Sequence, residues 1–216
     1  MEFSNSKGYK LSAEIDWPEG QGPFPFVIFS HGFGSSKNSP RTIPIARGLK
    51  ENSIGSFRFD YTGHGDSEGS EAESTFEQQR NDLETAIGKV EELDMINKQK
   101  IALHGASSGA LVTLMVAEKR DFKALLLRGP RIDGEYPQVE ENINKINTPI
   151  LAIQGEQDPM LKETERFLDK IGHSTTLAVI KGAGHLFQEP DQYAKVKQLT
   201  VSWLISVLLP AEFMIA

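Results

Sequence analysis

Cysteine is absent from the 216-residue sequence, so disulfides, thiolate nucleophiles and thiolate-ligated zinc are excluded. This absence is compatible with the reducing cytosol, and we expect a cytoplasmic protein. Positive charge is also in deficit, because the chain contains 23 Lys and Arg residues but 30 Asp and Glu residues. Its net charge is therefore −7. Since proteins bind nucleic acids largely through basic side chains that neutralise phosphates, we expect no nucleic-acid partner.

Long apolar runs are missing as well. The most apolar stretch, residues 201–216, is interrupted by polar residues, by Pro210 and by Glu212, well short of the roughly 20 apolar residues that span a bilayer. Charged residues near the N-terminus, among them Lys7 and Lys10, interrupt any apolar segment of a signal peptide. We therefore expect no signal peptide, no membrane span and a packed helix near the C-terminus.

The composition that is present suits a globular protein. Hydrophobic residues make up 38% and charged residues 25% of the chain, which provides apolar material for a sizeable core. We find no internal repeat, low-complexity segment or linker, so we expect one domain that covers residues 1–216. The pattern favours no particular oligomeric state.

Short apolar runs alternate with longer stretches of helical periodicity. After a strand pair expected within residues 1–16, the apolar runs lie at 26–29, 55–59, 101–104, 124–127, 150–153 and 177–180. The helical stretches lie at 41–51, 75–95, 108–119, 161–171 and 190–208. Strands of a parallel sheet are covered on both faces and read as continuous apolar runs. The pattern therefore predicts an α/β fold, with a mostly parallel sheet of about eight strands and helices on both faces.

The strongest local signal is the segment Gly105-Ala106-Ser107-Ser108-Gly109, which follows an apolar run and precedes a helical stretch. A Gly-x-Ser-x-Gly pentapeptide between a strand and a helix is typical of a nucleophile elbow, in which the serine sits on a sharp, strained turn. The glycines are needed there because side chains would collide with the neighbouring strand and helix. The alternative is a glycine-rich turn that only packs closely.

A serine nucleophile needs a histidine to take its proton and an acid to orient that histidine. Asp158 and His185 each follow an apolar run, so both come at the carboxyl ends of predicted strands, where Ser107 also lies. We therefore predict a catalytic triad of Ser107, Asp158 and His185. Other carboxylates lie nearby in the sequence, and Glu156 is the strongest alternative as the acid.

A glycine-rich segment, Ser30-His31-Gly32-Phe33-Gly34, follows the apolar run at 26–29. Glycines there allow backbone N–H groups to point at one spot, where the oxyanion of a tetrahedral intermediate would lie. We predict that the backbone N–H groups of Phe33 and Ser108 form this oxyanion hole. His31 is expected to hold the loop rather than to act as a second base.

With these residues in order, the chain resembles the α/β hydrolases over essentially its whole length. Residues 60–67, Asp-Tyr-Thr-Gly-His-Gly-Asp-Ser, match a turn that is common after the fourth strand in that family, in which Asp60 and His64 would stabilise the turn. The resemblance is strongest to the serine-aminopeptidase-like, acylglycerol-lipase and cinnamoyl-esterase branch. It implies the α/β-hydrolase fold and the activity of a serine hydrolase.

One departure from that branch concerns the cap. Relatives often insert a helical cap after the sixth strand, whereas about twenty residues separate Arg128 from Pro149 here, and a helical pattern covers only residues 138–145. We expect no sizeable lid, an open site and a preference for short acyl chains.

Two arginines, Arg128 and Arg131, follow the sixth strand on the rim that is expected to face the site. They could contact an anionic part of the substrate. We favour the alternative that they pair with Asp133, Glu135 or solvent, because this is usual for arginines at a surface.

The predicted reaction is hydrolysis of carboxylic esters of small molecules through an acyl-enzyme. It requires neither a metal nor an organic cofactor. Thioesterases and peptidases would use the same triad, and some proteins of this fold bind small ligands without turnover. A complete triad argues against pure binding, because a binding protein has no need for Ser, Asp and His in register.

Overall fold

Eight strands form one sheet in the computed structural model of the chain, which describes residues 1–132, 137–172 and 174–209. Their order across the sheet is β1-β2-β4-β3-β5-β6-β7-β8. β2 runs antiparallel to its neighbours β1 and β4, and all other neighbouring strands are parallel. The strands are Glu2–Ser4 (β1), Lys10–Asp16 (β2), Phe24–Ser30 (β3), Gly55–Phe59 (β4), Ile96–Ala106 (β5), Ala124–Arg128 (β6), Ile150–Gly155 (β7) and Thr175–Ile180 (β8).

Continuous apolar sequence places the central strands inside the molecule. Every residue of β3, β4, β6 and β7 is buried, as expected for parallel strands covered on both faces. β8, at the edge of the sheet, is only partly buried. Successive side chains of a strand point to opposite faces, so Leu125 and Leu127 of β6 join one core cluster and Leu126 joins the other.

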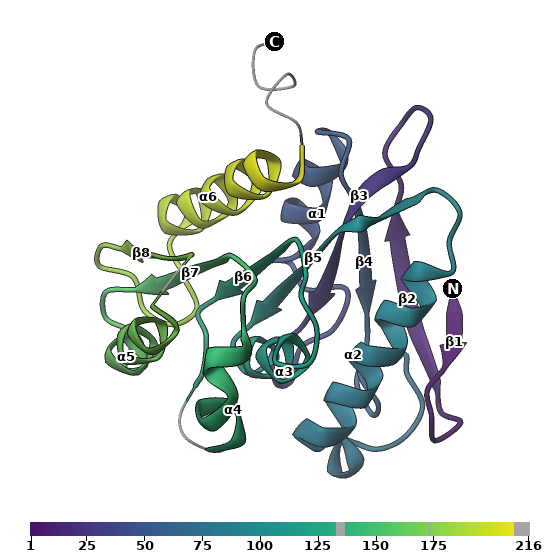
Figure 1. The fold of residues 1–216 in the computed structure, drawn as a ribbon, viewed down its shortest axis with the longest axis horizontal. Coiled ribbons are helices and arrows are strands. Elements are labelled where there is room, and N and C mark those ends of the chain that lie inside the picture. The colour runs from purple at the N-terminus through teal and green to yellow at the C-terminus, as the bar shows by residue number, and fades with distance from the viewer. Residues whose placement is uncertain (133–136, 173, 210–216) are drawn as a thin grey trace.

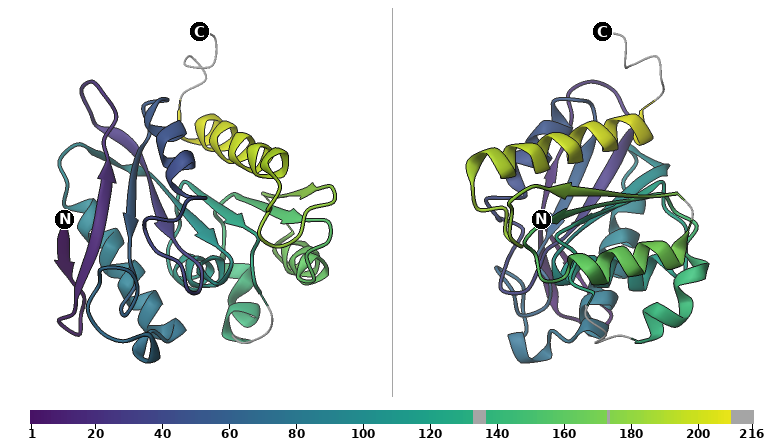
Figure 2. Two further views of the ribbon diagram at one scale, coloured as in Figure 1. Left: turned by 180° about the vertical axis from the view of Figure 1, so that it is seen from behind. Right: turned by 90° about the vertical axis from the view of Figure 1, so that its left-hand side faces the viewer.

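Helices cover both faces of this sheet (Figures 1 and 2). α1 and α6 lie on one face, and α2, α3 and α5 lie on the other. Among the described helices, none combines the length and the apolar character needed to cross a bilayer. The helices are Ile43–Lys50 (α1), Phe76–Glu91 (α2), Ser108–Ala117 (α3), Pro137–Asn142 (α4), Leu161–Ile171 (α5) and Pro190–Leu208 (α6), with short 3-10 helices at Glu71–Glu73 (η1) and Ile143–Lys145 (η2).

The predicted α/β architecture is confirmed, and two element boundaries differ by four residues or more from the predicted ones. β5 begins at Ile96 rather than near 101, because the polar residues 97–100 hide this part of the strand from a search for apolar runs. α2 ends at Glu91 rather than near 95, because the chain there turns into β5. At that turn the Met95 carbonyl accepts the Phe24 N–H at 2.8 Å.

The connection between β6 and β7 is short, as the sequence predicts. Its described part contains the single-turn elements α4 and η2 and no large insertion. The fold is therefore one without a sizeable lid.

The order of the strands reverses next to β3. From β3 the chain crosses to β4 on one side and then to β5 on the other. In sheets of this kind ligands bind beside such a reversal, at the carboxyl ends of the strands. The loop after β3 and the turn after β5 meet at this edge, and each carries part of the predicted site.

A buried ion pair holds the turn that follows β4. Lys37, from the loop after β3, and Asp60 are 4% and 0% exposed, and Lys37 Nζ lies 2.6 Å from Asp60 Oδ2. Asp60 also accepts the backbone N–H groups of Lys37 at 2.6 Å and of Asp66 at 3.0 Å. Gly65 has a φ of +52°, and a Cβ there would lie 2.2 Å from Asp60 Oδ2. The glycine thus allows the turn to wrap around the carboxylate.

We expect Gly65→Ala to lower the free energy of unfolding by about 2–4 kcal/mol, because it combines a left-handed backbone with a collision in a filled site. Gly88→Ala is the matched control. Gly88 lies inside α2 with nothing within 4 Å of its would-be Cβ, so alanine should raise the free energy of unfolding by about 0.5–1 kcal/mol. Urea denaturation of both variants measures the difference. Equal stability of the two variants would contradict this account of the turn.

Candidate active site

Ser107 occupies a strained turn between β5 and α3. Its φ of 52° and ψ of −121° are unusual for a residue with a side chain. The flanking glycines permit this turn. A Cβ at Gly105 would lie 2.5 Å from Ala110 Cα, and one at Gly109 would lie 2.4 Å from the Ser30 carbonyl oxygen. These contacts are the physical reason for the Gly-x-Ser-x-Gly pattern, and they present the Ser107 hydroxyl at the carboxyl edge of the sheet.

His185 and Asp158 lie next to this serine in a hydrogen-bonded chain. Ser107 Oγ is 2.9 Å from His185 Nε2, and His185 Nδ1 is 2.7 Å from Asp158 Oδ2. The Asp158 carboxylate is buried and also accepts hydrogen bonds from Gln154 Nε2 at 2.6 Å and from the Met160 N–H at 3.0 Å. A carboxylate held in this way keeps the proton on Nδ1, so that Nε2 can accept the proton of a hydroxyl.

The alternative acid, Glu156, lies elsewhere. It is exposed, and its Oε2 accepts the Gly182 N–H at 2.8 Å. Of the carboxylates considered from the sequence, the structure brings Asp158 against His185. Gln154 is a residue that sequence reasoning missed. It lies inside β7 with 0% exposure, and a fully buried glutamine indicates a polar partner, here Asp158.

The two predicted oxyanion donors lie on either side of Ser107, but one of them is engaged. The Phe33 N–H donates to Ser108 Oγ at 2.8 Å. Ser108 is the first residue of α3, so its N–H belongs to the donors that no helical carbonyl accepts. Gly32 allows the loop after β3 to approach, since a Cβ there would lie 3.0 Å from the Ala106 carbonyl oxygen. A substrate oxygen would therefore have to replace Ser108 Oγ at the Phe33 N–H.

His31 lies beneath the same loop and makes no hydrogen bond to Ser107. Its Nε2 accepts the Tyr61 N–H at 3.2 Å, which leaves Nδ1 to donate to the Gly32 carbonyl oxygen at 2.9 Å. Burial lowers the pKa of His31 to about 4. A neutral histidine with both nitrogens engaged fits the expectation that His31 holds the loop.

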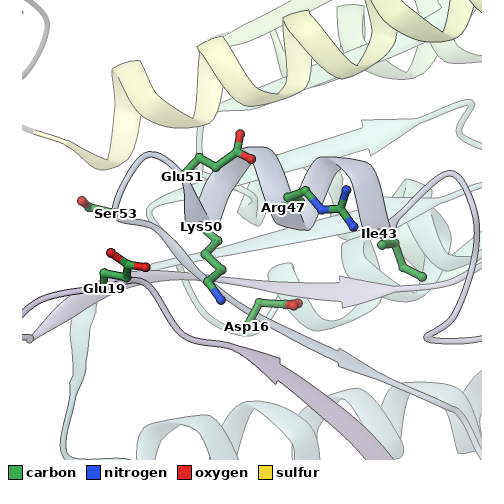
Figure 3. Close-up of a pocket in the computed structure, with 7 residues that line it drawn as sticks. All are labelled: Asp16, Glu19, Ile43, Arg47, Lys50, Glu51 and Ser53. Carbon is green, nitrogen blue, oxygen red and sulfur yellow. The ribbon is translucent and has the colours of Figure 1, made fainter.

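Two hollows lie at the turn that carries Ser107 and Ser108, and both are lined by Phe33 and Arg131. The larger, of about 670 Å³, is lined by Ser107 and His185 together with Arg41, Arg128 and other residues of the surrounding loops. The smaller, of about 310 Å³, lies against Ser108 and the start of α2. A third hollow of about 500 Å³ lies away from this site, against α1, where Lys50 extends toward Asp16 and Glu19 (Figure 3).

The expectation for Arg128 needs correction. Its side chain is not a solvated rim group, because the residue is only 9% exposed and lines the larger hollow. Asp133 and Glu135, the other partners expected from the sequence, lie outside the described residues. Arg131 is exposed, and its backbone N–H donates to the Ser107 carbonyl oxygen at 3.2 Å. The burial of a residue at the end of a strand, such as Arg128, depends on the face of the sheet to which its side chain points. The sequence around Arg128 does not reveal this face.

Among residues 1–132, 137–172 and 174–209, no three histidine, aspartate or glutamate residues form a group that could hold a metal ion.

The fold and the position of the elbow place this protein among the α/β hydrolases. A family model described as an alpha/beta hydrolase domain matches residues 24–205, and the chain belongs to this family.

Three curated relatives show how far the similarity extends. A Mycobacterium tuberculosis protein provisionally named a phosphoribosyl transferase is 27% identical over 203 residues, which cover 86% of this chain and 42% of that protein. Alpha/beta hydrolase domain-containing protein 17C of Xenopus tropicalis is 24% identical over 74% of this chain and 55% of its own length. The Escherichia coli protein YfhR is 24% identical over 97% of this chain and 81% of its own length. The chain thus spans about half the length of the first two relatives.

Solved structures agree on the fold. Est1E from Butyrivibrio proteoclasticus, determined with ferulic acid bound, superposes with a TM-score of 0.86 at 20% identity, covering 97% of this chain and all of its own. Dienelactone hydrolase from Anabaena variabilis superposes with a TM-score of 0.80 at 25% identity, covering 96% and 98%.

Two buried histidines predict an acid-sensitive fold. Burial lowers the pKa of His104 to about 3, with a further contribution from the Arg128 cation, and that of His31 to about 4. As the pH falls below about 6.5, the unfolded chain takes up these protons before the folded one does. The folded state therefore loses stability from that point down to the folded pKa values. At pH 5 each histidine should lower the free energy of unfolding by about 2 kcal/mol relative to pH 8.

Urea denaturation of the wild type and of His104→Phe at pH 8 and pH 5 tests this prediction. Phenylalanine keeps a ring against Phe29, whose centroid lies 4.8 Å from that of His104. The variant should lose about 2 kcal/mol less than the wild type over this range. Identical losses would show that His104 does not contribute.

Proposed function

We propose that the protein hydrolyses carboxylic esters, preferentially those with short acyl chains, through a Ser107-His185-Asp158 triad and an acyl-enzyme intermediate. The observation that carries this proposal is the hydrogen-bonded chain from Ser107 Oγ to His185 (2.9 Å) and on to Asp158 (2.7 Å), built on a strained turn. A strained backbone is costly, and such residues cluster at active sites.

In the proposed first step, His185 Nε2 takes the Ser107 proton as Oγ attacks the ester carbonyl carbon. The tetrahedral intermediate then collapses, the C–O bond to the alcohol breaks, and the alcohol leaves with the proton from His185. In the second step, water gives a proton to His185 and attacks the acyl-enzyme, which releases the acid and restores Ser107. Asp158 keeps the imidazole in the required tautomer and stabilises its protonated form.

The proposed oxyanion hole consists of the Phe33 and Ser108 N–H groups. The carbonyl oxygen would displace Ser108 Oγ from the Phe33 N–H, with which it now forms a 2.8 Å hydrogen bond. A developing negative charge accepts such a hydrogen bond more strongly than a neutral hydroxyl does. The exchange therefore favours the transition state over the free enzyme.

The two hollows at the elbow bear on the size of the substrate. The larger, of about 670 Å³, is lined by Ser107, and the smaller, of about 310 Å³, is lined by Ser108. The described part of the connection between β6 and β7 contains no large insertion. Two hollows suit the acyl and alcohol halves of a small ester, and neither resembles a closed tunnel for a long chain. Esterase and dienelactone hydrolase are names of structural neighbours and support an ester substrate. The transferase name belongs to a relative of which this chain spans 42%.

The first experiment compares the wild type, Ser107→Ala and Ser202→Ala on p-nitrophenyl acetate, butyrate and longer esters. Ser202 is an exposed α6 residue and controls for the loss of a hydroxyl. We expect kcat/KM to fall at least about 10⁴-fold in Ser107→Ala, as for loss of a triad nucleophile, and to stay unchanged in Ser202→Ala. Equal rates in the wild type and Ser107→Ala would refute the mechanism, and a chain-length optimum above roughly ten carbons would refute the preference for short acyl chains.

A second pair of variants tests the acid. Asp158→Asn preserves the shape but removes the charge that orients His185, so kcat should fall by about 10²–10⁴-fold. Glu156→Gln makes the same chemical change two residues away, at a carboxylate that bonds Gly182 instead. Its kcat should stay within about twofold of the wild type. Steady-state assays on the best ester decide between the two, and a larger loss in Glu156→Gln would reverse the assignment.

A further inference from the structure

Arg128 is a buried cation at the base of the candidate active site. It is the last residue of β6, and strand alternation puts its side chain on the same face as Leu126, toward α1 and α6. It lines the hollow that contains Ser107 and His185, and it is 91% buried. The guanidinium therefore faces the space that a substrate would fill.

This guanidinium has no counterion in the part of the chain that the structure describes. Its Nε is buried without a hydrogen-bond partner. Within residues 1–132, 137–172 and 174–209, no side chain forms an ion pair or hydrogen bond with its other two nitrogens. The adjacent strand contributes His104, whose two ring nitrogens are also without partners and whose lowered pKa keeps it neutral. A histidine in that state supplies no negative charge. Burial lowers the pKa of Arg128 to about 10, which still leaves it charged at neutral pH.

A second guanidinium faces the same hollow. Arg41, which precedes α1, lines this hollow and is half-buried. Its positive charge repels that of Arg128. The structure gives backbone hydrogen bonds for Arg41, one from its N–H to Ser39 Oγ and one from Tyr193 to its carbonyl oxygen. Among the described residues no carboxylate pairs with its side chain.

Among the described residues around this hollow, the acidic side chain is already bound. Of the residues that line the hollow, Asp158 is the acidic one, and its carboxylate is bound to His185, Gln154 and the Met160 N–H. Two like charges near each other in a partly desolvated space are unfavourable unless an anion lies between them. The chain as a whole carries a net charge of −7, so this local excess of positive charge is not a property of its general surface.

We propose that the ester cleaved at this site carries a carboxylate, which Arg128 and Arg41 bind; this inference rests on the proposed function. The planar guanidinium matches a carboxylate through paired N–H donors. The hollow also has two exposed apolar side chains, Phe33 and Leu186, which are 73% and 48% exposed. The favoured substrate is therefore a small ester with a short apolar part and a charged end.

The test uses pairs of esters that differ only in charge. In the first pair the charge lies in the acyl half, as in the 4-nitrophenyl monoesters of glutaric acid and of its monoamide. In the second it lies in the leaving group, as in 3-carboxyphenyl and 3-carbamoylphenyl butyrate. After spontaneous hydrolysis is subtracted, the wild type should show at least about tenfold higher kcat/KM for the carboxylate of one pair. The pair that responds identifies the half of the substrate that faces Arg128.

The variants Arg128→Met and Arg41→Gln should each lower that carboxylate-to-amide ratio about tenfold or more. Arg47→Gln is the matched control, because Arg47 is an exposed α1 arginine that lines the separate hollow in Figure 3. It removes the same charge and should leave the ratio unchanged. If Arg128→Met fails to fold, as thermal melting would reveal, the half-buried Arg41 still gives the answer. A wild type without preference in either pair, or an equal effect of Arg47→Gln, overturns the proposal.

Binding separates this inference from the proposed function. Titration calorimetry of Ser107→Ala with monomethyl glutarate needs no turnover, and binding should weaken at least about tenfold when Arg128→Met is added. If no ester is hydrolysed but this loss is seen, the proposed function fails and the carboxylate site stands. If the titration shows no binding, or equal binding in both proteins, the carboxylate site fails.

Discussion

The close approach of two backbone segments is the constraint on which the site depends. The loop after β3 passes the turn after β5 so closely that a Cβ at Gly109 would lie 2.4 Å from the Ser30 carbonyl oxygen, and one at Gly32 would lie 3.1 Å from Ser107 Cβ. This approach brings the Phe33 N–H beside the start of α3, where Ser107 has a positive φ of 52°. The reversal of strand order next to β3 makes the approach possible, because β3 and β5 are then adjacent and parallel.

The loop after β3 is held in turn by groups that never face a substrate. Lys37 and Asp60 form a buried ion pair, Arg58 donates to the Lys37 carbonyl oxygen at 2.7 Å, and His31 joins Gly32 to Tyr61. Breaking one partner of such a network leaves a buried charge or donor unsatisfied, which costs more than the hydrogen bond itself contributes. The geometry of the candidate oxyanion hole is thus determined by a turn on the neighbouring strand β4.

Much of the fold could be predicted from the sequence because its information is local. Continuous apolar runs specify buried parallel strands, and the spacing of Gly105, Ser107 and Gly109 follows from contacts with residues a few positions away or on the adjacent strand. The juxtaposition of Ser107, Asp158 and His185 was predictable for a related reason, since the carboxyl ends of parallel strands share one edge. The start of β5 was not predictable, because residues 97–100 are polar although they belong to the strand.

Two features of the site lay beyond sequence reasoning. The hydrogen bond from Phe33 to Ser108 Oγ depends on a side-chain rotamer, and the burial of Arg128 depends on how α1 and α6 cover the end of β6. Both arise where segments more than sixty residues apart in the sequence meet. No periodic pattern in the sequence indicates either of them.

The net charge of the chain and the local charge in the hollow have opposite effects on an anionic substrate. A net charge of −7 repels an anionic substrate at a distance, so the field of the whole protein does not guide such a substrate to the site. At physiological ionic strength this repulsion is screened beyond about 8 Å. Within the hollow, Arg128 and Arg41 act across a few ångströms and through a medium less polar than water, where an ionic contact is stronger. Selection of a carboxylate would therefore occur at contact, after encounter, and would alter the strength of binding more than the rate of association.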